Sequence, residues 1–403
     1  MEKEVYMRDK IVYLVTVVLA IAYIALGHQW AARGEMGYRG EREDFIKARV
    51  VEIVNRTDRG TIIEGMGYQD GVSIQFMAKV LGGPLKGETV LALQATDPMA
   101  PVPVKEVEEG DKILLFRQEN MPEDLGWIAG DYVRFDSLVA LGVVFAVFLL
   151  IFGRVNGINT LVSLGFTCAS VFLVFIPSIL SGKNIYLSAC ATCVFIILMT
   201  LLIVTGANEK GLAAALGCFG GSALVGILTL IMSAVMGLTG LVSEESAFLY
   251  YLNPDNPIDL KGIIFGAIMV GAIGAIMDVA VAIAASLKEV QAQAPDIRFV
   301  QLTRSGFTIG RDVVGTMANT LVLAYIGSSL SIVLLLVAYN NSLLYLLNKE
   351  MIVVEILQSL VGVFGILFAI PFTSVVSSFL YTRGRAADPP TAAGQSLSSG
   401  EYR

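Results

Sequence analysis

The feature that most constrains this chain is a series of apolar runs, each long enough to cross a lipid bilayer. A helix needs about 20 apolar residues to cross a hydrocarbon core of roughly 30 Å. About eight such runs occur, near 10–27, 137–153, 158–180, 185–205, 211–237, 261–287, 313–339 and 351–381. Composition agrees, because 55% of the residues are hydrophobic and only 16% are charged. The sequence therefore predicts an α-helical polytopic membrane protein with about eight transmembrane helices.

The first run resembles both a signal peptide and an anchor. Basic residues precede the stretch from Ile11 to Leu26, but this apolar core is long and no small-x-small cleavage site follows before Trp30. We therefore expect residues 1–27 to be a cytoplasmic N-terminus followed by an uncleaved first transmembrane helix.

The orientation follows from the Lys and Arg residues of the short loops, which are retained on the cytoplasmic side. With the N-terminus inside, 12 of these residues lie on the inner side, and only Lys183, Lys261 and Lys349 lie in short outer loops. We expect a multi-pass protein of the cell membrane with both termini in the cytoplasm.

Residues 28–136 differ from the rest of the chain because their pattern is typical of β-strands. The stretches that indicate strands are "FIKARVVEIV" (45–54), "GVSIQFMAKVLGGPLKGETVLALQA" (71–95) and "VEEGDKILLF" (107–116). They predict a small extracytoplasmic β-barrel-like domain of OB-like type. Residues 137–385 then form a seven-helix transmembrane domain, and the Pro, Ser and Gly content of 386–403 predicts a disordered cytoplasmic tail.

The apolar stretch "GAIGAIMDVAVAIAASLKEV" (271–290) carries one carboxylate, Asp278, near its middle. An acid at mid-membrane costs about 2.5–3.5 kcal/mol on the most lenient insertion scale. At 3.6 residues per turn Asp278 shares a stripe with small residues, and bulky residues take the opposite side. The small stripe is Ala267, Gly271, Gly274, Asp278, Ala282 and Ala285; the bulky side is Phe265, Met269, Ile276 and Ile283. We expect the stripe to face the bundle interior and the bulky side to face lipid.

The next span, "GRDVVGTMANTLVLAYIG" (310–327), carries a polar face. Its members are Asp312, Thr316, Asn319, Thr320 and Gly327, and Arg311 precedes them. Counting residues from the inner surface places Asp278 and Asn319 at comparable depth. Such oxygens could hold a proton-exchanging water chain or a small hard cation such as Na⁺ or K⁺. The alternative is that Asn319 and Thr320 bond across helices and keep Asp278 neutral as packing.

Glu355 and Gln358 lie together at the outer end of the last span. They predict an outer gate, with an interfacial acid that snorkels to the surface as the alternative.

Enzyme chemistry is not expected. The chain has one His, no H-E-x-x-H motif, and no second carboxylate at the depth of Asp278. Cys190 and Cys193 are spaced like a metal or redox pair, but without a second ligand pair they indicate small buried apolar residues. We expect no bound metal or organic cofactor.

The motifs "GAIGAIMDVAVAIAASL" and "SGFTIGRDVVGTMANTLVLAYIG" resemble those of the YibE/F family of multispanning membrane proteins, and the likeness extends over nearly the whole chain. That resemblance implies a membrane protein associated with transport of an unassigned substrate. An intramembrane Asp followed by a helix with Arg and Asn-Thr is also similar to one half of the SecD/SecF and RND-type proteins. That weaker resemblance implies coupling to proton flow, with Asp278 as the coupling acid and Arg311 as its basic partner.

Two function hypotheses follow. The first is a proton- or cation-coupled transporter or energy-coupling subunit that uses Asp278 with the facing Asn/Thr helix. The second is a non-transporting membrane scaffold or sensor whose outer β domain recruits a partner. Gly-rich faces on several spans permit self-association, so a homodimer or a pairing with a homologous chain is expected, in contact with the bilayer and with no nucleic acid.

Overall fold

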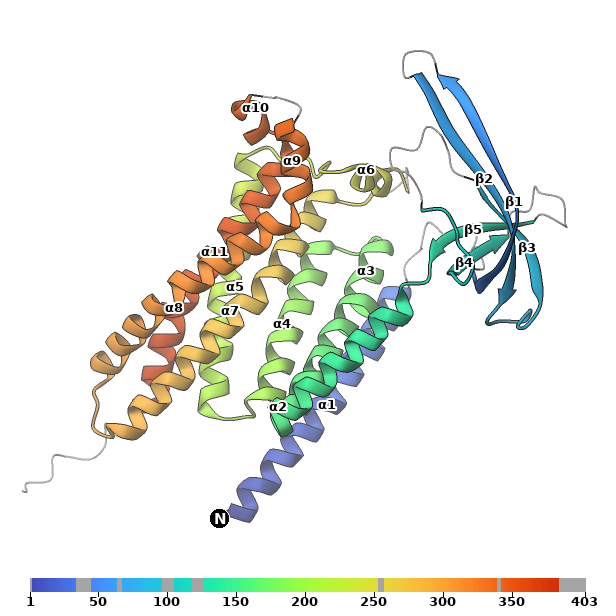
Figure 1. Cartoon of the computed structure of the whole chain (residues 1–403). Coiled ribbons are helices and arrows are strands. Elements are labelled where there is room, and N and C mark those ends of the chain that lie inside the picture. Colours follow the sequence, from blue (N-terminus) through green and yellow to red (C-terminus); the bar gives the residue numbers. More distant parts are fainter. Residues whose placement is uncertain are drawn as a thin grey trace, which may run out of the picture. The chain divides into compact units, whose positions relative to one another are not determined.

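The computed structural model describes residues 2–33, 45–63, 67–95, 105–117, 126–252, 257–338 and 342–383 of the 403-residue chain. The chain forms two compact units, Met1–Tyr38 with Phe152–Arg403, and Arg39–Ile151. The first is helical and the second carries the β-strands (Figure 1). The tail predicted for 386–403 lies outside the described residues.

The helices follow the chain in this order: α1 (Glu2–Ala32), α2 (Phe135–Ser170), a π-helical turn (Val171–Phe175), α3 (Ile176–Leu180), α4 (Ile185–Val204), α5 (Glu209–Val235), α6 (Glu244–Tyr251), α7 (Leu260–Gln293), α8 (Phe299–Ser328), α9 (Leu330–Ala338), α10 (Leu343–Leu347) and α11 (Glu350–Thr382). Pro371 lies inside α11.

Six helical runs among the described residues are long and apolar enough to cross a membrane: Ile11–Ala32, Phe135–Leu180, Ile185–Val204, Glu209–Val235, Leu260–Gln293 and Glu350–Thr382. This confirms a multi-pass membrane protein that is mostly helical. The segments predicted as 137–153 and 158–180 belong to a single run, which contains one non-helical residue, Arg154, at φ 49° and ψ −124°. The helix α8 is not among the six, because one of its faces is polar.

The second unit contains a five-stranded closed barrel with the strand order β1-β2-β3-β5-β4. The strands are β1 (Ile46–Ile63), β2 (Gly67–Val80), β3 (Thr89–Ala95), β4 (Lys112–Arg117) and β5 (Trp127–Tyr132). Alternate residues of β2 point inward, so Ile74, Phe76 and Ala78 lie in the barrel core with Ile113 and Leu115 of β4. The strands predicted from 45–54, 71–95 and 107–116 are confirmed, and β5 adds a parallel pairing with β3.

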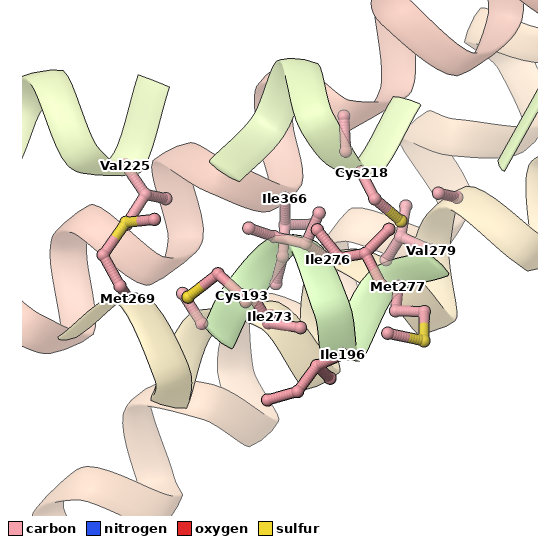
Figure 2. Close-up of a cluster of buried hydrophobic side chains, with 14 of the residues drawn as sticks. Cys193, Ile196, Cys218, Val225, Met269, Ile273, Ile276, Met277, Val279 and Ile366 are labelled. Carbon is pink, nitrogen blue, oxygen red and sulfur yellow. The ribbon is translucent and has the colours of Figure 1, made fainter. Parts of the chain in front are cut away.

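The core of the helical unit lies where α11 packs on α5, α7 and α8. Glycines allow this close packing, because a methyl group added to Gly221 of α5 would stand 2.9 Å from the carbonyl oxygen of Gly365 in α11. Ile276 of α7 fills the space beside both glycines and is fully buried. Figure 2 shows Ile276 in this cluster with Cys218 of α5 and Ile366 of α11.

Candidate functional site

The helix α7 places Asp278 in the middle of 34 helical residues. The helix begins after Asp259, whose carboxylate accepts hydrogen bonds from the backbone N–H groups of Lys261 at 3.1 Å and Gly262 at 3.2 Å. This cap satisfies two of the donors that a helix leaves free at its start. Asp278 lies about five turns from the start of this helix and about four turns from its end.

The predicted orientation of α7 is wrong. The bulky side packs into the bundle, where Ile276 and Ile283 are fully buried and Phe265 is 4% exposed. The small stripe is instead turned outward, and Gly274 and Asp278 are exposed on the surface of the unit. Small residues do permit close packing, but they stand on the neighbouring helices. Those of α5 and α11 accept the large side chains of α7: Gly221 and Gly365 contact Ile276, and Gly226 contacts Phe265 and Met269.

The carboxylate of Asp278 has no hydrogen-bond or ion-pair partner within the described part of the chain. The amide of Asn319 and the hydroxyl of Thr320, which were predicted to meet it, make no hydrogen bond with it among the residues that the structure describes. The hydroxyls nearby bond to their own helix, since Thr316 donates to the carbonyl of Val313 at 3.0 Å and Thr320 to that of Thr316 at 2.9 Å.

The helix α8 packs on the bundle through its apolar and small residues. Leu302, Gly306 and Gly310 are buried, and Gly310 lies against Ile370 of α11. The predicted polar face is turned away from the bundle, and each of its members is exposed: Arg311, Asp312, Thr316, Asn319, Thr320 and Gly327. The polar residues of α8 therefore share one face of the helix, as predicted, but this face does not point into the bundle.

The contacts between α7 and α8 fix their relative register. Leu287 lies against Gly306 near one end, and Gly271 lies against Tyr325 near the other, so the two helices run antiparallel. Interpolating between these contacts at about 1.5 Å per residue places Asp278 at the level of Thr316 and within about one turn of Asn319. The predicted similarity in depth is therefore confirmed.

Open space adjoins these polar residues. Apart from the adjoining residues and backbone of its own helix, no atom of the described residues lies within 4 Å of the position that a side-chain carbon would take on Gly274 of α7 or on Gly315 of α8. The carboxylate of one helix and the amide and hydroxyls of the other are therefore presented at one depth, on open surface.

Of the two residues predicted to form an outer gate, Glu355 and Gln358, the second makes a hydrogen bond with Tyr325 of α8. The amide nitrogen of Gln358 donates to the hydroxyl of Tyr325 at 3.3 Å, and both groups adjoin Gly271. Gln358 and Glu355 are half-buried. This contact ties α8 and α11 together beside α7. Gating by Glu355 remains a prediction.

Sequence reasoning missed two residues that organise this region, Tyr325 and Glu350. The carboxylate of Glu350, in the first turn of α11, accepts hydrogen bonds from the N–H groups of Thr239 at 2.7 Å and Gly240 at 2.6 Å, and from the Thr239 hydroxyl at 2.8 Å. It therefore fixes the loop after α5 to α11. The partners lie more than a hundred residues apart, so no local pattern indicates the pairing.

The hydroxyls that follow Pro371 are also buried in the bundle. Thr373, Ser374 and Ser378 are fully buried, and none of their side-chain oxygens has a hydrogen-bond partner among the described residues. Thr373 faces Gly217 of α5, and Ser374 faces Gly306 of α8.

Two grooves lie away from Asp278. One of about 830 Å³ lies between α4, the start of α5 and the end of α7, with Lys210 and Lys288 on its rim, and Lys288 pairs with Glu209 at 2.9 Å. Another of about 470 Å³ adjoins Tyr23 and Trp30 of α1. Neither is lined by a predicted site residue. The described residues gather no group of three His, Cys, Asp or Glu side chains suited to a metal ion.

Comparison with known proteins places the chain in a family. No curated protein and no solved structure matches it. A family model described as YibE/F-like protein matches residues 141–383, well over half of the chain. The matched segment contains α7, α8 and α11, and with them Asp278, the polar face of α8 and the Gln358–Tyr325 contact. The chain therefore belongs to the YibE/F-like family.

Proposed function

We propose that this protein is a proton- or cation-coupled transporter or energy-coupling subunit, and that Asp278 is its coupling group. One observation carries the proposal: a carboxylate in the middle of a membrane-length apolar helix is exposed and has no partner in the described chain. Intramembrane acids are costly, and they are kept mainly where an ion or proton must be bound.

The alternative role of Asp278 as packing requires contacts that the described residues of the single chain do not make. A carboxylate held only for packing would be neutralised by donors on the facing helix. The hydroxyls of Thr316 and Thr320 bond to their own helix instead. A carboxylate that no protein group occupies can be reached by a proton, a water molecule or a cation, which supports exchange.

The residues of α8 would have supporting roles. At the depth of Asp278, Thr316, Asn319 and Thr320 supply hydroxyl and amide oxygens of the kind that hold water or a hard cation such as Na⁺ or K⁺. Arg311 and Asp312 lie one to two turns nearer the inner end of α8, where they would affect the charge of an ion on its way to or from Asp278. The half-buried Glu355 and Gln358 would act at the outer end.

Flux measurements test this proposal. Purified protein in liposomes is given a pH gradient or a sodium or potassium gradient, and ion movement is followed with internal dyes. We expect flux under one of these gradients, and its loss in Asp278→Asn. Asp296→Asn, in the exposed loop after α7, serves as the matched control and retains flux. Full activity of Asp278→Asn would contradict the proposal for either ion.

The proposed topology has eight crossings of the cell membrane, with both termini in the cytoplasm. The run Phe135–Leu180 has 46 residues, about 69 Å of helix, which is more than twice the roughly 30 Å core. A break at Arg154 would let it cross twice, and α8 with α9 would cross once. Labelling of single introduced cysteines with a membrane-impermeant thiol reagent in whole cells tests the side of each loop.

We also propose that the barrel is of OB-like type, because five strands in a closed Greek-key order with one parallel β3–β5 pairing suit that fold. The alternative function, a scaffold or sensor, is favoured by exposed apolar side chains beside and on β1: Phe45, Val51 and Val54 are each at least half exposed. Under that alternative, a partner protein would still bind after the polar side chains of the α8 face are removed. It would no longer bind after Phe45, Val51 and Val54 are replaced with Ser.

A further inference from the structure

We propose that a second copy of this chain covers the surface formed by Gly274, Asp278, Thr316, Asn319 and Thr320, and completes the site around Asp278. We call this the α7–α8 surface. The proposal rests on the membrane location of α7, and it depends on the proposed function only for what the completed site does.

Hydrocarbon is a poor environment for the α7–α8 surface. In the single chain it exposes a carboxylate in the middle of α7, which is otherwise apolar there, and an amide and two hydroxyls at a similar depth on the polar face of α8. Lipid tails can neither donate nor accept hydrogen bonds, so charged and polar side chains at this depth face protein or water. Within the described part of the chain, α5 and α11 pack mainly against the bulky face of α7, and they leave the side chain of Asp278 exposed.

The two halves of the surface complement each other. The half on α7 offers a carboxylate acceptor, with Gly274 beside it, which would let another helix approach closely. The half on α8 offers the amide N–H groups of Asn319 as donors, whereas the hydroxyls of Thr316 and Thr320 already donate to carbonyls of their own helix. Donor and acceptor do not meet within the described part of one chain, and each half lacks what the other half has.

An identical chain is the suitable partner, because its carboxylate and its donors lie at the same membrane depths as those of the first chain. A twofold axis along the membrane normal keeps every residue at its own depth in both copies. Since Asp278 lies level with Thr316 and within about a turn of Asn319, that axis brings α7 of one copy against α8 of the other with carboxylate and donors at the same height. The reciprocal contact forms at the same time, which is the isologous arrangement that most homodimers use. An unrelated partner would need to reproduce both patterns at this depth.

Disulfide formation between chains tests the contact. In a background where Cys168, Cys190, Cys193 and Cys218 are replaced, Gly274→Cys is made in one tagged chain and Thr320→Cys in a chain with a different tag. The two are co-expressed, and the membranes are oxidised. A side chain at position 274 would extend into open space, and Thr320 is exposed. Gly274→Cys and Thr320→Cys therefore leave the packing of the bundle unchanged. We expect a disulfide that links the two tags.

Two controls define the specificity of the disulfide. Gly327→Cys is also exposed on α8, but seven residues along the helix, about 10 Å from the depth of Thr320; it should not cross-link with Gly274→Cys. Leu230→Cys lies on an exposed part of α5, and it should not cross-link with either position.

Three results would overturn the proposal. The first is equal cross-linking by the control positions, which would show random collision. The second is a disulfide within one chain that carries both Gly274→Cys and Thr320→Cys, without linked tags, because α8 would then close on its own α7. The third is absence of the mixed disulfide in membranes where both chains are present. Failure of the proposed function is separate, since Asp278→Asn with unchanged flux could coexist with intact linked tags.

Discussion

The two faces of α7 show how this protein uses one helix for two purposes. One face carries Ile276 and Ile283, which are fully buried against α5 and α11. The other carries Gly271, Gly274 and Asp278, which are exposed. The bulky face holds the bundle together, and the small face presents a carboxylate. The comparison teaches that in this bundle the acid is separated from the packing, so that a change of its charge need not disturb the core.

The largest effect on stability is expected from Gly221→Leu, which adds a large side chain where α5 packs against α11 and the bulky face of α7. A side chain at Gly221 meets the carbonyl oxygen of Gly365 and the side chain of Ile276. We expect a loss of about 3 kcal/mol or more in the free energy of unfolding, because backbone cannot move aside. Gly274→Leu is the matched change on the open face, and it should leave thermal unfolding of detergent-diluted single chains nearly unchanged. Equal losses of stability in Gly221→Leu and Gly274→Leu would contradict the difference in packing between the two faces of α7.

Ile276→Ala is expected to have the next largest effect. It removes three carbons from a fully buried site between two glycines, where backbone cannot collapse to fill the cavity. We expect a destabilisation of about 2 kcal/mol or more, measured as a lower unfolding temperature in the same detergent. Ile227→Ala, on an exposed part of α5, is the control and should have little effect. If Ile227→Ala costs as much as Ile276→Ala, the buried and exposed faces have been assigned wrongly.

A smaller effect is expected from Tyr325→Phe at the outer end of the open face. The substitution removes the hydroxyl that accepts the amide N–H of Gln358 at 3.3 Å. We expect a loss of about 1 kcal/mol, the usual contribution of one neutral hydrogen bond, and easier separation of α8 from α11. Tyr345→Phe, at an exposed tyrosine, is the control. A stability unchanged by Tyr325→Phe would mean that this contact does not hold α8 in place.

The smallest effect on stability is expected from Asp278→Asn. The substitution keeps size and shape, and no hydrogen bond or ion pair of the described chain is lost. We expect the free energy of unfolding of single chains to change by less than about 0.5 kcal/mol, while ion flux is lost. A large change in stability, in either direction, would show that Asp278 has a structural contact after all.

Much of this architecture could be predicted from the sequence. The apolar runs gave the helices, the alternation in Ile74, Phe76 and Ala78 gave a strand of the barrel, and residue counting gave the common depth of Asp278 and Asn319. Each of these follows from a periodicity or a length, which are local properties of the chain.

The orientation of α7 could not be predicted in the same way. Between Lys261 and Lys288 its only charged residue is Asp278, so its two faces differ in size more than in polarity. Size alone does not decide which face packs, because the glycines that accept Ile276 lie on α5 and α11, far away in sequence. The hydrogen bonds of Glu350 to Thr239 and Gly240 were missed for a related reason, since they join distant segments.

Chemical modification of Asp278 tests the central claim most directly. An apolar carbodiimide in membranes reacts with protonated carboxyl groups that it can reach, and mass spectrometry of the α7 peptide reports the product. The account predicts modification of Asp278 in the native protein, stronger at low pH than at high pH because only the protonated acid reacts, and reduced by the coupling ion if that ion is a metal cation. An Asp278 that stays unmodified at every pH, in protein that is still folded, would contradict it.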